Sequence, residues 1–475
     1  MRWAIPFVLV LVAVVASCAE NSGEEPAGDA STLSEMSAQG WTMLGYDVRS
    51  SFHNTHESTV SVANVGELEE FWQIEAPVNG MAAVVDNVVY VLSTDSFTAR
   101  DVATGEPIWE NENVRGTSTP TFSNGMLFVN AGDSVLYALD PRTGEELWQV
   151  VVDSHPNASG FSSPVAYGDL VIVGSSSGEE RVAADNATFR GAVVAFDRET
   201  GEEVWRYYTV EPPENGVAVW SSVSIDGEAG VVFATTGNNY TEEAGPTSDA
   251  IFALDVETGE LLWLTQLSEG DVYTVFNPRS PDFDFGTNPI LFDASGRKLL
   301  GAGQKSGVFW VLDRETGEVV WSRQVSGGSA LIGGVFNNGA YDGERIIVAG
   351  NGGESDGPGS EPATGESEPV PLSGTQFGTS VLMAMDPADG SIIWERQLPA
   401  WVWAPITIAN GVGYVSAESE LQAFDVETGK KLFAFQTGGT ITSGAAVVDG
   451  QVYFGSGLVY FNTTPNNIFH ALALP

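Results

Sequence analysis

A nine-residue phrase recurs along most of the chain and limits its possible folds more than any other feature. An apolar stretch is followed by Asp-x-x-Thr-Gly-x-x-x-Trp, in which Asp and Gly suit a tight hairpin turn and Trp begins the next strand. Consecutive copies lie 39 to 73 residues apart, and the shortest spacing matches one four-stranded propeller blade. The sequence therefore predicts an all-β fold, a β-propeller. Five close copies and two weaker ones begin at Asp101, Asp140, Asp197, Asp255, Asp313, Asp386 and Asp425.

The two ends of the repeat region carry complementary halves of a further copy. Residues 68–72 supply a Trp strand with no preceding turn, and residues 468–472 supply an apolar strand with no following turn. Pairing these two strands would close the ring and remove its open sheet edges. We therefore expect one eight-bladed β-propeller over residues 40–475, closed by its N- and C-terminal strands. The repeated Asp, Gly and Trp residues are then architectural, and function must come from other residues.

Charge and cysteine content exclude several classes of function. The chain has a formal net charge of -44 with only 19 Lys and Arg, so it lacks the basic surface that binding to nucleic acid phosphates requires. Its single cysteine, Cys18, leaves no intramolecular disulfide, iron–sulfur cluster, all-cysteine zinc site or haem attachment motif. The four histidines show no convincing metal-ligand spacing.

The N-terminus has the pattern of a bacterial lipoprotein. Residues 1–17 contain one positive charge and an apolar run too short to span a membrane, and they end in Val-Ala-Ser before Cys18. We expect residues 1–17 to be a lipoprotein signal peptide, Cys18 to be lipidated, and residues 18–39 to be a flexible tether. The protein would then be extracytoplasmic and lipid-anchored to a bacterial membrane, on the periplasmic side or the cell surface, and would meet the membrane only through this lipid. An ordinary signal peptide with an incidental cysteine is the alternative.

The repeat resembles the tryptophan-docking motif of the quinoprotein family, the alcohol dehydrogenases that depend on pyrroloquinoline quinone (PQQ). The same blades occur in lipoproteins that assist outer-membrane protein assembly, so the repeat does not separate the two. The middle of the chain is most similar to polyvinyl alcohol dehydrogenases. The stretches that carry this similarity are Ser175–Glu180, Phe189–Gly191, Val219–Ser222, Thr236–Asn239, Asp282–Gly286 and Gln304–Gly307.

The resemblance implies two cofactors, PQQ and Ca²⁺. Calcium prefers carboxylate and amide oxygens as ligands, and the family motifs assign the ion to Glu180, Asn238 and Asp284. Glu179 is an alternative to Glu180, since adjacent residues on a strand point to opposite faces. All of these residues could also be ordinary turn residues.

The same resemblance implies the catalytic and cofactor-binding residues. Asp284 matches the general base that takes the hydroxyl proton of an alcohol, with Asp282 as the alternative. The family motifs assign cofactor binding to Arg115, Ser162, Trp220, Lys305 and Trp403. Trp220 would form the floor beneath the flat quinone, while Lys305 would bond the quinone oxygens and Arg115 a cofactor carboxylate.

Three departures from the family are visible. The chain lacks the adjacent cysteines of methanol-type members and any haem motif, so electrons must pass to a separate acceptor such as a cytochrome. Residues 78–82 contain no glutamate, although many members have one there that binds the cofactor. Residues 351–375 are rich in Gly, Ser, Pro and Glu and read as a long surface loop or a disordered insertion.

The leading hypothesis is a lipid-anchored dehydrogenase that depends on PQQ and Ca²⁺ and oxidises small or polymeric alcohols. One alternative is a non-catalytic propeller lipoprotein that acts as a binding or outer-membrane-protein assembly scaffold. Another is a degenerate quinoprotein that binds PQQ or another ligand without turnover.

Overall fold

The structure is a computed structural model that describes residues 40–181, 186–328, 330, 332–352, 378–458 and 463–475. The predicted signal peptide, the tether and Cys18 lie outside these residues, as does most of the stretch 351–375. Strands dominate the described residues, and the helical elements are two short 3-10 helices, η1 (Val65–Glu67) and η2 (Glu179–Arg181). No described helix is both long enough and apolar enough to span a membrane.

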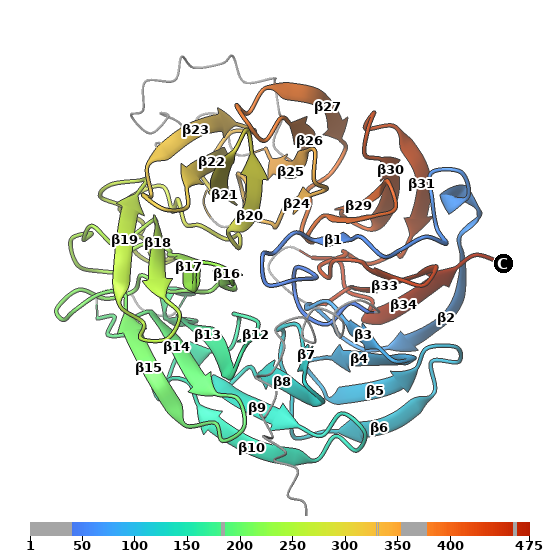
Figure 1. Cartoon of the computed structure of the whole chain (residues 1–475), viewed down its shortest axis with the longest axis horizontal. Coiled ribbons are helices and arrows are strands. Elements are labelled where there is room, and N and C mark those ends of the chain that lie inside the picture. Colours follow the sequence, from blue (N-terminus) through green and yellow to red (C-terminus); the bar gives the residue numbers. More distant parts are fainter. Residues whose placement is uncertain (1–39, 182–185, 329, 331, 353–377, 459–462) are drawn as a thin grey trace, which may run out of the picture. The chain divides into compact units, whose positions relative to one another are not determined.

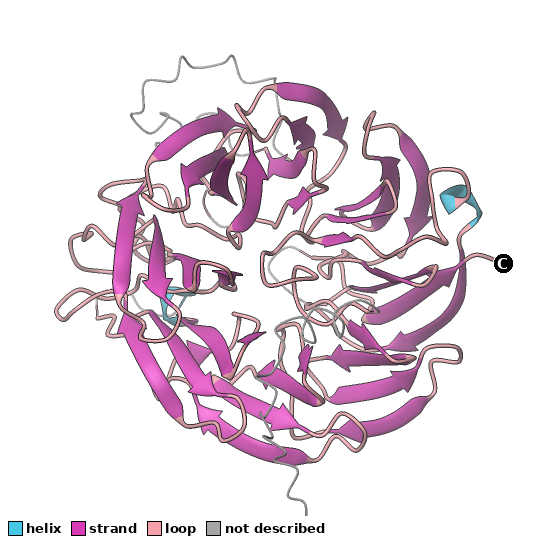
Figure 2. Ribbon diagram, in the orientation of Figure 1, coloured by secondary structure: helices cyan, strands magenta, loops and turns pink. Residues whose placement is uncertain are grey.

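The described strands form eight sheets that follow one another round a ring, so the predicted eight-bladed β-propeller is confirmed (Figures 1 and 2). Blades 1 and 2 comprise β3 (Ala83–Val85), β4 (Val88–Leu92), β5 (Phe97–Asp101), β6 (Pro107–Asn111), β7 (Thr121–Ser123), β8 (Met126–Asn130), β9 (Val135–Leu139) and β10 (Glu146–Val151). Blades 3 and 4 comprise β11 (Ala158–Ser159), β12 (Val165–Tyr167), β13 (Leu170–Ser177), β14 (Ala192–Asp197), β15 (Glu203–Tyr208), β16 (Ser224–Asp226), β17 (Val231–Thr235), β18 (Ala250–Asp255) and β19 (Leu261–Gln266). Blades 5 and 6 comprise β20 (Ile290–Ala294), β21 (Arg297–Gly303), β22 (Val308–Asp313), β23 (Val319–Gln324), β24 (Ala340–Tyr341), β25 (Ile346–Asn351), β26 (Ser380–Met385) and β27 (Ile392–Leu398). Blades 7 and 8 comprise β1 (His53–Asn54), β28 (Thr407–Ala409), β29 (Val412–Ala417), β30 (Glu420–Asp425), β31 (Lys431–Gln436), β32 (Ala446–Val448), β33 (Gln451–Ser456), β34 (Ile468–Ala473) and β2 (Glu69–Glu75).

Blade 8 is built from both ends of the repeat region. Its strand order is β2-β34-β33-β32, and β2 pairs antiparallel with β34 from Glu69 opposite Ala473 to Glu75 opposite Ile468. This is the closure that the two incomplete repeat copies predict. It leaves the outer edge of β34 paired, which removes the open edge that the last sheet would otherwise present.

At seven of the eight junctions, a tryptophan fastens one blade to the next. The indole N–H of Trp148, for example, donates to the carbonyl oxygen of Arg198 at 3.1 Å, and the ring covers Gly201 in the Asp-Thr-Gly turn of the next blade. Gly201 has φ +71° and a Cβ atom there would lie 2.6 Å from the Trp148 ring, so both the turn and the packing require glycine. The same donation is made by Trp72, Trp109, Trp205, Trp263, Trp321 and Trp394.

The junction between blades 7 and 8 is built differently. Phe433 occupies the tryptophan position of blade 7, and blade 8 has no Asp-Thr-Gly turn because its outer strand comes from the other end of the chain. Phe433 and Leu432 instead pack against a core cluster that contains Val65 and Leu68, in and beside η1. An apolar segment thus replaces the tryptophan and glycine pair.

Residues 41–54, the plug segment, cross the centre of the ring and bond to its inner strands. Backbone hydrogen bonds join this segment to β3, β7, β16, β20, β24 and β28, and β1 within it pairs in parallel with β28. The Asn54 side chain adds a 2.7 Å bond to the carbonyl oxygen of Val447 in β32. The plug segment is therefore hydrogen-bonded to seven of the eight blades, and Leu44 within it lines the central cavity.

Candidate active site

A central cavity of about 600 Å³ lies at one end of the ring. Apart from Leu44 of the plug segment and Ser177 at the end of β13, its lining comes from two kinds of connection, those after the second strand of a blade and those before the first strand of a blade. In an antiparallel blade these two connections lie at the same edge, so the topology itself gathers their side chains. Six of the site residues predicted from the sequence line this cavity: Glu180, Trp220, Asn238, Asp284, Lys305 and Trp403.

Asp284 lies at the centre of a fixed polar group. Its Oδ1 accepts a hydrogen bond from the backbone N–H of Asn238 at 2.7 Å, and its Oδ2 accepts one from Lys305 Nζ at 2.9 Å. The side chain is 3% exposed, and a Cβ atom on Gly237 would lie 2.8 Å from Oδ1. The carboxylate is therefore held in one orientation while it faces the cavity.

Asp282, the alternative to Asp284, lies behind it. Its Oδ1 accepts a hydrogen bond from Lys305 Nζ at 2.8 Å, its side chain is fully buried, and it is not among the described residues that line the cavity. Burial raises the pKa of Asp282 well above its ordinary value, and Lys305 offsets this only in part. Burial alone would lower the pKa of Lys305, but Asp282, Asp284 and Glu180 together hold it well above its ordinary value. Lys305 is thus a buried cation that bridges the side chains of Asp282 and Asp284.

Glu179 and Glu180 differ sharply in their surroundings. The prediction that Glu179 and Glu180 lie on a strand is wrong: β13 ends at Ser177, and the two residues begin the 3-10 helix η2. Glu180 faces the cavity, and burial followed by the repulsion of Asp284 raises its pKa to about 7 despite the attraction of Lys305. Glu179 is 4% exposed, and its Oε2 accepts hydrogen bonds from the backbone N–H groups of Thr188 and Phe189.

Trp220 forms one wall of the cavity. The Lys305 Nζ atom lies 5.6 Å from the centre of its ring, within the range of a cation–π contact. A Cβ atom on Gly286, which also lines the cavity, would lie 2.5 Å from Cη2 of Trp220, so the backbone at Gly286 lies directly against the edge of the indole. Trp403 lies farther along the lining, edge-on to Phe336 with ring centres 6.2 Å apart.

Asn238 presents its amide oxygen rather than its nitrogen as the available group. Its Nδ2 donates to the carbonyl oxygens of Asn239 and Tyr273 at 2.6 and 2.9 Å. Among the described residues no three His, Cys, Asp or Glu side chains converge as a metal site, so any cation here would need this amide as well as the carboxylates.

Two predicted residues are not brought to the cavity surface. Arg115 is exposed, and Ser162 is fully buried with its hydroxyl accepting the N–H of Gly174 at 2.9 Å. The neighbouring Ser163 lines the cavity instead. Cys18, the predicted lipidation site, lies outside the described residues.

Arg181 and Asn79 are polar lining residues that were not among the predicted site residues. Arg181, directly after Glu180, lines the cavity, and its guanidinium lies 5.9 Å from the centre of the Phe161 ring. Among the described lining residues, Arg181 and Lys305 carry the positive charges. Asn79 lines the cavity from the stretch 78–82, which contains no glutamate. Its position in that stretch, and the place of Arg181 beside a candidate ligand, were the available signals.

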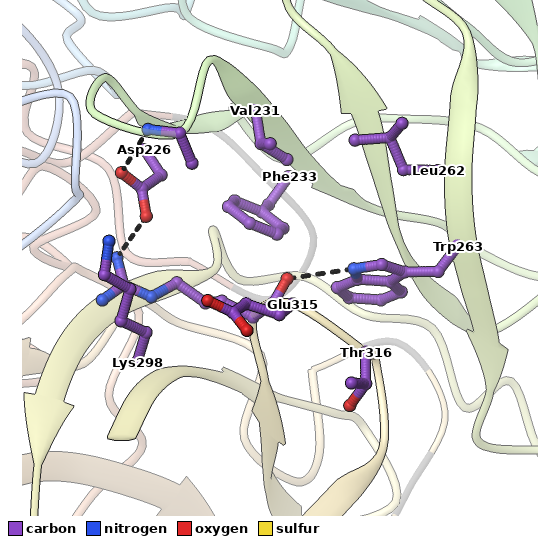
Figure 3. Close-up of a pocket in the computed structure, with 10 residues that line it drawn as sticks. Asp226, Val231, Phe233, Leu262, Trp263, Lys298, Glu315 and Thr316 are labelled. Carbon is purple, nitrogen blue, oxygen red and sulfur yellow. Dashed lines mark hydrogen bonds and ion pairs between the residues drawn. The ribbon is translucent and has the colours of Figure 1, made fainter. Parts of the chain in front are cut away.

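A second cavity, of about 400 Å³, lies at the junction of blades 4 and 5 (Figure 3). The docking tryptophan Trp263 and Phe233 form its apolar side. Arg314 of blade 5 crosses to Asp226 of blade 4 at 3.0 Å and also pairs with Asp293. Since the arginine and its partners hold the two blades together, we assign this cavity to blade packing.

Comparison with known proteins places the chain among propellers of two kinds. The family model described as outer membrane protein assembly factor BamB matches residues 56–248, 189–368 and 357–471. Polyvinylalcohol dehydrogenase from a Pseudomonas species is 30% identical over 455 residues, covering 84% of this chain and 68% of that protein. Polyvinylalcohol dehydrogenase from Sphingopyxis sp. (strain 113P3) is 28% identical, covering 83% of this chain and 66% of that protein. The crystal structure of quinohemoprotein alcohol dehydrogenase from Comamonas testosteroni superposes with a TM-score of 0.74 at 20% identity, covering 94% of this chain and 82% of that one. The last similarity concerns the fold.

Proposed function

The chain belongs to the quinoprotein alcohol dehydrogenase family, whose members are oxidoreductases acting on alcohols, and we propose that its central cavity binds PQQ and a calcium ion. The observation that carries this proposal is that oxygen ligands, a buried cation and an indole line one cavity. They come from three different blades, 3, 4 and 5, and the fold brings them together. These residues are Glu180, Asn238, Asp284, Lys305 and Trp220.

The donor set fits a hard divalent cation. Glu180 and Asp284 offer carboxylate oxygens, and the orientation of Asn238 leaves its amide oxygen available. Oxygen ligands of mixed charge are what calcium prefers, with further positions filled by other oxygens. Glu180, Asn238 and Asp284 would hold the ion.

The cavity also fits a flat, tricarboxylated quinone. Trp220 offers an aromatic face, and the close approach of Gly286 to Cη2 restricts where the indole can lie. Lys305 would bond the quinone oxygens. We propose Arg181, the second lining cation, as a partner for a cofactor carboxylate, because Arg115 is exposed outside the described lining.

When bound, PQQ supplies the quinone that accepts the hydride from the alcohol carbon. Asp284 acts as general base and takes the proton of the substrate hydroxyl on a carboxylate oxygen. Lys305 and the Asn238 N–H hold this carboxylate in place, so that little reorganisation is needed when the proton arrives. Trp403, Phe336 and Ile332 surround the approach with apolar surface that limits water.

We extend the substrate class to small and polymeric alcohols, because relatives named for polyvinyl alcohol match most of this chain. Electrons would pass to a separate acceptor such as a cytochrome. The extracytoplasmic location and the lipid anchor at Cys18 are proposals from the sequence pattern alone.

Reconstitution tests the proposed function. Purified apoprotein is mixed with PQQ and Ca²⁺, and dye reduction is followed with primary, secondary and polymeric alcohols. We expect PQQ binding and turnover, while Asp284→Asn should retain PQQ and lose turnover. Absence of PQQ binding by the folded wild type would refute the proposal and favour the assembly-scaffold alternative. Normal turnover by Asp284→Asn would show that another group is the base.

A further inference from the structure

The carboxylate of Glu179 joins the two ends of the connection that carries Glu180. Its Oε2 accepts hydrogen bonds from the backbone N–H of Thr188 at 3.0 Å and of Phe189 at 2.8 Å. These donors lie nine and ten residues farther along the chain. A buried carboxylate that accepts two backbone N–H groups removes two costly unpaired donors and fixes the chain that carries them.

The backbone around Glu180 is held on both sides. The carbonyl oxygen of Glu180 accepts a hydrogen bond from the N–H of Val275 at 3.1 Å, and the N–H of Arg181 donates to Gly178 at 3.0 Å. The N–H of Glu179 itself donates to the Ser177 hydroxyl at 2.8 Å. These contacts leave the side chain of Glu180 to face the cavity while that of Glu179 points into the protein.

The two hydrogen bonds from the Thr188 and Phe189 N–H groups to Glu179, which we call the clasp, also connect η2 to the wall beneath the cavity. Phe189 is fully buried in a cluster with Ala187, Ala218 and Tyr240, and Trp220 packs against this cluster. The Phe189 and Tyr240 rings are stacked with centres 6.5 Å apart. The backbone N–H of Phe189 is therefore a fixed anchor, and Glu179 transfers its position to η2.

We propose that Glu179 is the positioning residue that sets Glu180 for cation binding, rather than a ligand itself. This proposal rests on the proposed function of the cavity, because it assumes that Glu180 binds a metal. Without the clasp, Glu180 would occupy its binding position in only a fraction of the molecules. The apparent affinity for the cation falls in proportion to that fraction. Arg181, the next residue of η2, would lose its position in the same way.

The test compares Glu179→Ala with Glu57→Ala as a matched control. Glu57 is 6% exposed and also accepts backbone N–H groups, from Thr59, Val60 and Gly450, but none of these residues lines the cavity. Two quantities are measured: amide hydrogen exchange at residues 188 and 189 in the apoprotein, and the affinity for Ca²⁺ in the presence of PQQ.

We expect the amide hydrogens of residues 188 and 189 to exchange faster in Glu179→Ala. We also expect this variant to bind Ca²⁺ about tenfold to a hundredfold more weakly, because that ratio corresponds to the loss of one hydrogen bond to a charged group. Glu57→Ala should keep wild-type Ca²⁺ affinity. Glu179→Gln retains an oxygen that accepts N–H groups, so it should bind Ca²⁺ as the wild type does. If Glu179→Ala does not fold, Glu179→Asp, which withdraws the carboxylate by one methylene, serves in its place.

Two results would overturn the proposal. Faster exchange with unchanged Ca²⁺ affinity in Glu179→Ala would show that the clasp does not position Glu180. Equal weakening by Glu179→Gln and Glu179→Ala would show that Glu179 is itself a ligand. Failure of the wild type to bind Ca²⁺ and PQQ would instead contradict the proposed function, and the exchange measurement would still report on the clasp.

Discussion

Replacing Gly286 with alanine should push Trp220 out of the position that the cofactor requires. The added Cβ atom would lie 2.5 Å from Cη2 of Trp220 and 2.7 Å from the carbonyl oxygen of Phe336. Ordinary carbon–carbon contacts are about 3.5–4.0 Å, so the indole must move by about 1 Å. The Phe336 carbonyl oxygen, 2.7 Å from the added atom, opposes relief by a small backbone shift, so the ring of Trp220 must be displaced.

The size of the effect follows from this overlap. Overpacking of this kind costs about 1–3 kcal/mol when the surrounding atoms cannot yield. Displacement of the Trp220 ring relieves part of this strain. Binding of PQQ would then require the ring to return to its original position, which restores the strain. If this strain of about 1–3 kcal/mol is restored on binding, the affinity for PQQ falls roughly 5-fold to 150-fold.

The assay separates stability from binding with a matched variant, Gly301→Ala. Its Cβ atom would lie 2.6 Å from Cζ of Phe309, an equivalent clash with an aromatic ring in the same blade but outside the described cavity lining. Urea unfolding should show a comparable loss of stability in both variants. Titration with PQQ and Ca²⁺, followed by tryptophan fluorescence, should show weaker binding only for Gly286→Ala. Equal PQQ affinity in the two variants would refute the assignment of Trp220 as the cofactor floor.

Three further outcomes are expected. Equilibrium dialysis should show that Arg181→Ala binds PQQ about tenfold more weakly and with a reduced dependence on salt, whereas Arg115→Ala binds it normally. Weaker binding by Arg115→Ala and normal binding by Arg181→Ala would show that Arg115 is the cofactor ligand. Glu180→Gln should reduce Ca²⁺ affinity by at least about tenfold in calorimetry, and unchanged affinity would exclude it as a ligand. Burial lowers the pKa of His470 below its ordinary value and Glu70, whose Oε1 is 2.6 Å from Nδ1, offsets this only in part. The unfolded state therefore binds more protons below about pH 6.5, so the wild type should lose more stability between pH 8 and pH 5 than His470→Asn; a smaller loss would mean that Glu70 dominates.

The ring was predictable because its signal is repeated. Each copy of the turn reports the same hairpin, and the unpaired halves at residues 68–72 and 468–472 identify the closing blade. The plug segment was not predictable in the same way. Its contacts are made by backbone atoms to six inner strands, and backbone hydrogen bonds leave no residue-specific pattern in a single copy.

For the candidate site, the sequence predicted which connections between strands carry the site residues. It did not predict which side chains of those connections point into the cavity. Glu180 and Asp284, singled out by their motif contexts, lie in connections at one edge of the ring, and their lining of one cavity follows from blade topology. Direction within a connection depends on local geometry that the motifs do not encode. A helical turn begins at Glu179 where a strand was expected, and Ser162 turns inward while its neighbour Ser163 faces the cavity.

The pairing of β2 with β34 has a consequence for the order of events during synthesis. Glu70 and His470, which touch across this pair, are 400 residues apart, so β2 leaves the ribosome long before its partner exists. Through that interval the edge of β2 that later pairs with β34 would be free to pair with another nascent chain. The strand carries three glutamates, Glu69, Glu70 and Glu75, and their mutual repulsion between chains opposes such pairing. Glutamates in β2 thus protect a half-built ring, and one of them, Glu70, later contacts His470 in the finished one.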